Sequence, residues 1–579
     1  MNNITDSTQG EAAKKPRSYL LYLLAIFLVA FFIRLIGITR YECDPDECRM
    51  VESALLFWEG YPPFFWEGYG FPTIVLWAIA YAAVWGIIHF AEILTLLAAK
   101  NFQGLILLAD AGYRHAYADP GFYNLLPISL NALTGSALTL VCYGISKRQF
   151  NSALAGLISA ATVAFAPRMV YWSSTLHPEM MMGLGFMGAI YFAMRHVDGG
   201  GNGSLVGAAI MVALMTACKI VGVVLVPMIV LAVAMAPRVG VVVRLKRLAL
   251  ALAVMAGAYL AFNPYSVMDI TLFAKGIYSR WTYFMDGEYL GREYHPTGLI
   301  YLLTPLRAMG YPPLVMGVVG LFVALFTNTR KALLLVAGVG AYILLMKESE
   351  LISNRYAIQV GLAVAVLTGG PAVATAAALK NRGKRRAAIL TGLVLALAAV
   401  PFWNTPNAIG KKLTGDTRAA AREWILNHVP SGSRVFETFV GPILPYNMAG
   451  IERGYRVFGD RIYKERDKVF KCEFFADAML SEERYLFKKF AYMRENVPPN
   501  PAYDVVEIIY FPDDPKLFED VDHFWAVTDA AYLKIGVGPG LYGRLKEVLR
   551  YAGVERARFS GQNMMGPDVV IYEVQLPGH

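Results

Sequence analysis

Long apolar runs recur along this chain from residue 18 to residue 403, and short basic clusters separate several of them. Most runs are close to the ~20 residues that a helix needs to cross a bilayer. The pattern predicts a mainly α-helical, polytopic membrane domain with about eleven transmembrane helices. They are expected roughly at 18–38, 122–146, 152–170, 177–196, 204–218, 219–236, 243–262, 309–327, 332–346, 357–379 and 387–403.

The basic clusters predict which helix ends face the cytoplasm, because loops on that side carry an excess of Lys and Arg. The clusters are Lys147-Arg148, Arg244 with Lys246-Arg247, Arg330-Lys331, and Lys380 through Arg386. The N-terminal residues 1–17 are placed on the same side, before a first span that we expect to be uncleaved. The chain after residue 403 is then expected outside the cytoplasm.

The stretch 71–98 does not fit this scheme as a simple span, although it is apolar enough. If it crossed the membrane alone, every later basic cluster would change sides. We therefore expect an aromatic-rich helix at the membrane surface, or half of a re-entrant pair with 102–109. An ordinary span is the alternative.

Composition agrees with an integral membrane protein. The chain has 579 residues, of which 56% are hydrophobic and 17% charged, against about 25% charged in soluble proteins. The net charge of +9 is explained by basic loops and does not indicate nucleic-acid binding. Of the five cysteines, Cys142 and Cys218 are expected in the core, and Cys43 and Cys48 are either paired or free.

The pattern changes near residue 404, where charges increase and the long apolar runs stop. Short β-type runs at 434–440, 505–510 and 569–574 alternate with helical segments at 418–426, 482–494 and 541–552. This predicts a soluble α/β domain over 404–579, outside the cytoplasm. It would follow a cytoplasmic tail, 1–17, and a membrane domain, 18–403, whose first outer loop is 39–121.

An acidic stretch, residues 41–49, follows the first predicted span directly and contains Asp44, Asp46 and Glu47. Carboxylates at a membrane boundary are costly unless they are solvated, paired or bound to a cation. The plainest interpretation is a loop that solubilises a helix end.

The predicted topology brings three further polar groups to the same side. One is the segment 173–179, with His177 and Glu179; another is the loop 263–297, with Arg292; the last is 347–356, with Lys347 and Arg355. Each has a structural alternative, such as a helix start or a cation that reaches for the membrane surface.

The order and spacing of short motifs resemble the GT-C superfamily of membrane glycosyltransferases over roughly residues 20–400. Within it, the chain is most similar to the protein O-mannosyltransferase and aminoarabinose transferase group. Glu179 stands where Asp is more usual, and Leu126-Pro127-Ile128 replaces an Arg that commonly opens the second span. The matching motifs are Asp44-Pro45-Asp46-Glu47, Gly60 through Thr73, Leu133-Thr134-Gly135, Ser174 through Glu179, Ala217-Cys218-Lys219, Asn263-Pro264-Tyr265 and Asn354-Arg355-Tyr356.

The resemblance implies transfer of a hexose or pentose from a polyprenyl-phosphate or dolichyl-phosphate carrier, with inversion, to an acceptor hydroxyl or amine outside the cytoplasm. A partly desolvated carboxylate can accept the acceptor's proton. Asp46 is the first candidate for this base and Glu47 the second. Asp44, His177 and Glu179 are candidates for orienting the acceptor or tuning the base.

The departing lipid phosphate requires positive charge. Arg355 offers a bidentate fork and Lys347 a point charge, while Lys219 and Arg292 are weaker candidates. No cofactor is required, but Asp44-x-Asp46 also matches a common divalent-metal pattern.

Two alternatives from other classes are a transporter or flippase and a non-catalytic assembly subunit. A transporter predicts ionisable residues near the bilayer midplane and internal repeats, whereas the acids here cluster at span ends. The expected partners are a polyprenyl-phosphate sugar, membrane lipids and a protein, lipid or glycan acceptor, with no nucleic acid. The expected location is the plasma or inner membrane.

Overall fold

The computed structural model describes most of the membrane domain and much of the C-terminal region. The described residues are 16–40, 45–58, 71–118, 120–237, 239–268, 270, 273–274, 277–278, 311–346, 354–379, 405–438, 441–442, 444–457, 502–507, 521–529, 541–560, 564 and 567–576. Side chains within 45–49, 113–118 and 120–124 are not described.

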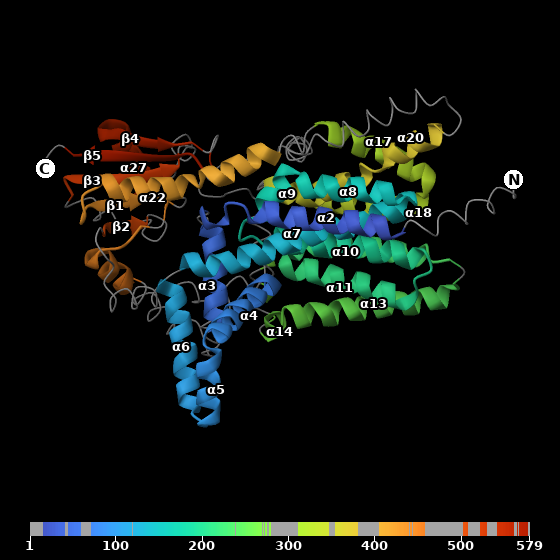
Figure 1. Ribbon diagram of the computed structural model, residues 1–579, viewed down its shortest axis with the longest axis horizontal. Helices are drawn as coiled ribbons and strands as arrows, with labels where there is room; N and C mark the ends of the chain where they lie inside the picture. Colours follow the sequence, from blue (N-terminus) through green and yellow to red (C-terminus); the bar gives the residue numbers. More distant parts are fainter. Residues whose placement is uncertain are drawn as a thin grey trace.

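A bundle of roughly parallel and antiparallel helices forms the larger part of the molecule (Figure 1). The helices of this bundle begin and end within a few residues of the predicted spans. The last predicted span, 387–403, is outside the described residues. The bundle helices are α2 (Pro16–Leu35), α7 (Pro120–Phe150), α8 (Ala153–Phe165), α9 (Pro167–Trp172), α10 (Glu179–Val197), α11 (Gly201–Cys218), η2 (Ile220–Leu225), α12 (Val226–Ala234), α13 (Val241–Phe262), α14 (Tyr265–Met268), α17 (Tyr311–Thr327), α18 (Thr329–Met346), η3 (Asn354–Ala357), α19 (Ile358–Leu367) and α20 (Gly370–Leu379).

The outer helices expose apolar side chains, as expected for surfaces that face lipid. On α2, for example, Leu20, Leu21 and Leu24 are all more than half exposed. Within the described residues, four helices are long and apolar enough to cross a membrane, or five if one bent pair counts as a span. Shorter apolar helices complete the bundle, and the chain is a membrane protein with the predicted mainly helical fold.

Helix α10 lies at the centre of the bundle and is buried along most of its length. Small residues allow its neighbours to approach closely. A side chain at Gly185 would begin 2.9 Å from the carbonyl oxygen of Met211 on α11. Without a hydrophobic force between helices in lipid, such close backbone packing is a main source of association. Cys142 and Cys218 are fully buried in this core, as predicted.

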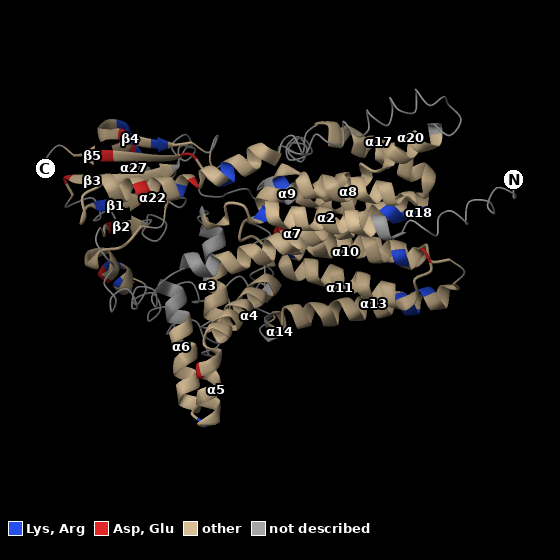
Figure 2. Ribbon diagram, in the orientation of Figure 1, with Lys and Arg blue, Asp and Glu red and all other residues tan. Residues whose placement is uncertain are grey.

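Charged residues of the bundle gather at its two ends, and the middle of the helices is almost free of them (Figure 2). One end, which we call the basic end, contains Lys147, Arg148, Arg244 and Lys331. The order of the helices brings the loops that contain these residues to the same end of the bundle. The opposite end faces the C-terminal sheet, and we call it the junction end (Figure 1). Chain order places the residues 173–179, 219 and 354–355 at the junction end.

The stretch 71–98 forms two helices, α4 (Phe71–Ile88) and α5 (Phe90–Ala98), that are bent by 78° relative to each other. The chain returns along α6 (Phe102–Ala118), and α5 and α6 form a hairpin across the direction of the bundle helices (Figure 1). Helix α5 has no buried residue, and Phe90, Leu94 and Leu97 are exposed. The stretch is therefore not one straight helix, while its placement at the membrane surface, as half of a re-entrant pair or as a span stays a prediction.

The C-terminal region contains a five-stranded mixed sheet in the order β2-β1-β3-β5-β4. Strand β1 pairs in parallel with β2 and β3, whereas β5 is antiparallel to both β3 and β4. This confirms an α/β fold. The elements are α22 (Thr417–His428), β1 (Arg434–Glu437), β2 (Asp504–Glu507), β3 (His523–Asp529), α27 (Leu541–Ala552), β4 (Gly553–Phe559) and β5 (Val569–Gln575), while the predicted helix 482–494 is outside the described residues.

A candidate active site at the junction end of the bundle

The segment between α9 and α10 is a compact turn that its own polar side chains hold in place. Ser174 Oγ donates to the carbonyl of Val170 at 2.8 Å. The amide of Asn131, on α7, lies 2.7 Å from the Thr175 carbonyl, 3.1 Å from that of His177 and 3.3 Å from that of Trp172. Buried carbonyls need such donors. Asn131 therefore fixes the backbone that presents the next residues.

Glu179 opens helix α10 directly after this turn, where the positive end of the helix dipole favours a carboxylate. Its Oε1 forms an ion pair with Lys219 Nζ and lies 3.7 Å from Arg355 Nε. Its Oε2 lies 3.8 Å from Nδ1 of His177. Three segments that are far apart in the sequence thus meet at one carboxylate.

The two cations come from breaks in the helices. Lys219 has extended backbone dihedrals between α11 and η2, and Arg355 lies in the short helix η3 before α19. A residue in the middle of a membrane helix would place its charge in the hydrocarbon region. These breaks instead place both cations at the junction end.

Burial separates the roles that these residues can have. Glu179 and His177 are essentially inaccessible, and the Lys219 side chain is only 6% exposed, whereas the Arg355 side chain is 15% exposed. Arg355 Nη1 lies 3.2 Å from both ring nitrogens of His177, so it can donate to the imidazole. Among the described residues, one carboxylate meets two basic side chains, and Arg355 is the more accessible of the two.

The predicted acid pair lies at the start of α3 (Pro45–Trp58), with the backbones of Asp46 and Glu47 in its first turn. Their side chains are outside the described part, as are Asp44, Lys347 and Arg292 in full. One turn later, Met50 is fully buried in an apolar cluster with Leu176, the residue before His177. The start of α3 is therefore packed against the turn that leads into Glu179.

The far end of α3 connects to the C-terminal region. Leu56 is fully buried in the same apolar cluster as Ala421 and Ile425 of α22. Helix α3 thus packs on the membrane domain through one set of residues and on the C-terminal domain through another. The backbone that carries the acid pair is held between the two.

Lys412 and Arg34 form a second buried polar contact at this junction. Lys412 Nζ donates to the Arg34 carbonyl at 2.7 Å and to Ser174 Oγ at 2.8 Å. The Arg34 guanidinium donates to Ser173 Oγ at 2.8 Å and to the carbonyls of Val163 and Ala164 at 3.1 Å. Both side chains therefore hold the first residues of the turn 173–178.

Arg34, Asn131 and Lys412 were missing from the residues predicted from the sequence. A single arginine near the end of the first apolar run was a signal for Arg34, since buried cations are rare in such runs. The role of Asn131 depends on carbonyls that come close only in the folded chain. In the described residues, no group of three or more His, Cys, Asp or Glu could hold a metal, and the proposed pattern at Asp44 and Asp46 lies outside that set.

Residues 125–266 match the model of the family described as dolichyl-phosphate-mannose-protein mannosyltransferase. The matched segment runs from α7 into α14 and contains Asn131, His177, Glu179 and Lys219. The match confirms the resemblance to GT-C membrane glycosyltransferases that the motifs indicated. Arg355, Asp46 and Glu47 lie outside the matched residues.

Solved structures with a similar overall arrangement include ArnT from Cupriavidus metallidurans bound to undecaprenyl phosphate, with 15% identity and a TM-score of 0.48 over 96% of this chain and 98% of that chain. They also include the Archaeoglobus fulgidus oligosaccharyltransferase in the apo form, with 13% identity and a TM-score of 0.47 over 94% and 74%. The comparison with curated proteins gives no match.

Proposed function

We propose that this protein is a membrane glycosyltransferase that transfers a sugar from a polyprenyl-phosphate carrier to an acceptor at the junction end of the bundle. The observation that carries the proposal is the buried cluster of Glu179 with Lys219 and Arg355, because Glu179 and Lys219 lie within the segment that matches the mannosyltransferase family. The extracytoplasmic side follows from the basic clusters at the opposite end.

Arg355 is the proposed ligand of the carrier's phosphate. Its guanidinium is the most accessible cation of the cluster, and a planar guanidinium can bind phosphate oxygens bidentately. Lys219 is less suited to binding the phosphate than Arg355, since it is almost fully buried in an ion pair with Glu179. We assign Glu179 to positioning both cations, with His177 supporting Arg355.

Asp46 is the proposed base, with Glu47 as the second candidate, because their backbones begin a helix that packs against the 173–178 turn. The acceptor hydroxyl would give its proton to the carboxylate as its oxygen bonds to the anomeric carbon. The bond between that carbon and the phosphate oxygen breaks, and the electron pair leaves with the lipid phosphate. This single displacement inverts the anomeric centre without a covalent sugar intermediate.

The phosphate assignment is tested by the affinity of the purified protein for undecaprenyl phosphate in detergent. Arg355→Ala should weaken binding by at least tenfold, because a hydrogen bond to a charged group contributes about 1.5–3 kcal/mol. Arg330→Ala removes an exposed cation from the basic end and is the matched control. Equal affinity of wild type and Arg355→Ala would assign Arg355 to membrane anchoring.

The base assignment is tested by turnover. Asp46→Asn should abolish sugar transfer while leaving the affinity for undecaprenyl phosphate unchanged, because the amide cannot accept the proton. Unchanged turnover would remove Asp46 from the mechanism, and the same experiment on Glu47→Gln would then test the second candidate.

The sugar and the acceptor are tested in cells. A comparison of glycolipids and glycoproteins by mass spectrometry, with and without the protein, should reveal one glycoform that depends on it and on Asp46. A flippase would instead move a lipid-linked sugar across vesicle membranes without consuming it. If removing the protein abolished that movement but left all glycoforms unchanged, the result would contradict a transferase.

A further inference from the structure

A pocket opens at the basic end of the bundle, away from the proposed active site. It has a volume of about 610 Å³ and is enclosed by residues of α7, α10, α11 and α18, with Asn151 and Asp198 from the turns at this end. Its charged end, at Asp198, lies 19 residues along the chain from Glu179, which is about 28 Å of helix, while its apolar end reaches Leu184 on the same helix. The charged half of the pocket is therefore far from the carboxylate cluster.

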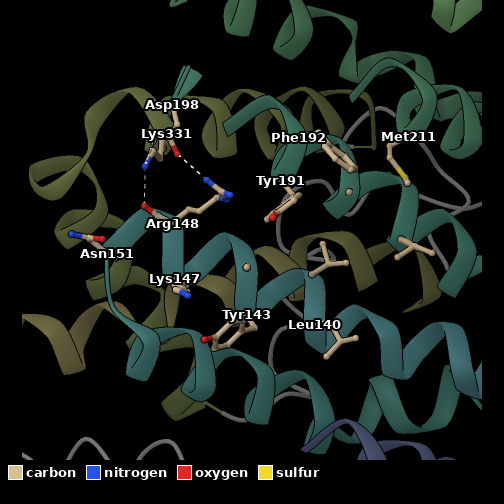
Figure 3. A pocket seen from close by; sticks show the side chains of 14 residues that line it. Leu140, Tyr143, Lys147, Arg148, Asn151, Tyr191, Phe192, Asp198, Met211 and Lys331 are labelled. Carbon is tan, nitrogen blue, oxygen red and sulfur yellow. Dashed lines mark hydrogen bonds and ion pairs between the residues drawn. The ribbon is translucent and has the colours of Figure 1, made fainter. Parts of the chain in front are cut away.

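The two halves of the pocket differ in chemistry (Figure 3). Apolar and sulfur-containing side chains line the half toward the middle of the bundle, including Leu140, Leu184, Phe192 and Met211. Leu140 is 40% exposed on a helix that is long and apolar enough to span the membrane, so this wall is continuous with the lipid-facing surface. The half at the basic end is lined by charged residues.

The charged half contains Lys147, Arg148 and Lys331 against a single carboxylate, Asp198. Asp198 lies 3.2 Å from Arg148 and 2.8 Å from Lys331, and Figure 3 shows both cations directed at it. Lys331 Nζ also donates to the Arg148 carbonyl at 2.9 Å.

Lys147 has no carboxylate partner among the described residues, and its Nζ lies 5.7 Å from the centre of the Tyr143 ring. Arg148 lies over the ring of Tyr191, with its central carbon 5.1 Å from the ring centre. Ring faces orient cations without neutralising them. The pocket therefore keeps a positive surplus next to an apolar wall.

We propose that this pocket binds an anionic phospholipid of the membrane. Its headgroup phosphate would contact Lys147 and Arg148, and one acyl chain would follow the wall formed by Leu140, Leu184 and Phe192. Basic pockets between transmembrane helices on the cytoplasmic side suit anionic lipid headgroups. A soluble anion would use the charged half only, whereas the exposed apolar wall favours a ligand with a hydrocarbon chain. This proposal is independent of the proposed sugar transfer.

The test measures binding of dioleoyl-phosphatidylglycerol and dioleoyl-phosphatidylcholine to the purified full-length protein by native mass spectrometry. Wild type should prefer the anionic lipid. Lys147→Gln should weaken phosphatidylglycerol binding about fivefold, the effect of one basic residue near an anionic headgroup, and Lys147→Arg should retain it. Lys246→Gln is the matched control, because Lys246 is exposed at the same end and does not line the pocket.

A second variant tests the hydrocarbon half without changing charge. Leu184→Trp fills the pocket beside the acyl chain and should weaken phosphatidylglycerol binding while leaving the thermal unfolding temperature close to wild type. The proposal is overturned if both lipids bind equally, if Lys246→Gln acts like Lys147→Gln, or if glycerol 3-phosphate competes as well as the lipid. It is also overturned if undecaprenyl phosphate displaces phosphatidylglycerol at a lower concentration than phosphatidylglycerol itself requires.

Discussion

The buried pair of Glu179 and Lys219 makes a quantitative prediction about stability. Both side chains are almost completely inaccessible, and they form a direct ion pair. Removing one partner of a buried ion pair costs about 3–5 kcal/mol, mainly because the remaining charge stays in a medium of low polarity. Glu179→Gln and Lys219→Met change the charge with little change in shape, so each should cost about this amount.

The two single variants should differ in a defined direction. Glu179→Gln removes the carboxylate from Lys219 and also from Arg355, whose Nε lies 3.7 Å away. Lys219→Met leaves Glu179 beside Arg355 and His177. Glu179→Gln should therefore be the more destabilising single change. The double variant should lose clearly less than the sum, with a coupling of at least about 1 kcal/mol for residues in contact.

The measurement is unfolding in mixed micelles by titration with sodium dodecyl sulfate, followed by tryptophan fluorescence. The matched control is Glu92→Gln, because Glu92 pairs with His89 at 3.0 Å but is 55% exposed. An exposed pair contributes only about 0–1 kcal/mol. If Glu179→Gln costs no more than Glu92→Gln, or if the two single effects add without coupling, the assignment of a buried, mutually dependent pair is refuted.

Three further predictions concern the turn 173–178 and its supports. Asn131→Asp should destabilise the protein more than Asn131→Ala, because a carboxylate would face three carbonyl oxygens; equal thermal unfolding temperatures would contradict this. Gly37→Ala should lower the unfolding temperature, since φ is +74° and a Cβ would begin 2.6 Å from the Lys412 carbonyl oxygen, and a wild-type temperature would exclude this close approach. Burial and the Arg34 charge lower the pKa of Lys412 to about 7, below its value in the unfolded chain. The folded state then binds fewer protons than the unfolded state, so stability should rise with pH from about 7 to 10, by up to about 1.4 kcal/mol per pH unit. Lys412→Met should flatten this part of the profile of stability against pH, and an unchanged slope would refute the role of Lys412.

The membrane helices could be predicted from the sequence because length and apolar composition decide them almost alone. The C-terminal strands β3 and β4 were missed for two different physical reasons. Strand β4 lies at the edge of the sheet and has three consecutive exposed residues, including the charged Glu555 and Arg556, so it lacks the apolar pattern of a buried strand. In β3, the buried run begins only at Phe524, within a polar and acidic surrounding sequence.

The site was predicted in part because its charged residues are conspicuous in an apolar chain. His177, Glu179, Lys219 and Arg355 do come together, as the predicted helix order required. The pairing among them could not be predicted, because it depends on which side chain a helix break directs inward. The sequence offered Lys219 as a weaker candidate for binding the donor phosphate, and the fold places it in an ion pair with Glu179.

This pairing also bears on which carboxylate can act as the base. A base must gain a proton as the acceptor attacks, but a cation in contact favours the ionised form of a carboxylate. Glu179 contacts Lys219, has Arg355 nearby and is 1% exposed, so protonating it would remove the negative charge that both cations face. We therefore propose that the base is a carboxylate outside this cluster. Asp46 and Glu47 stay the proposed bases, because their backbones belong to α3, which packs on the turn before Glu179.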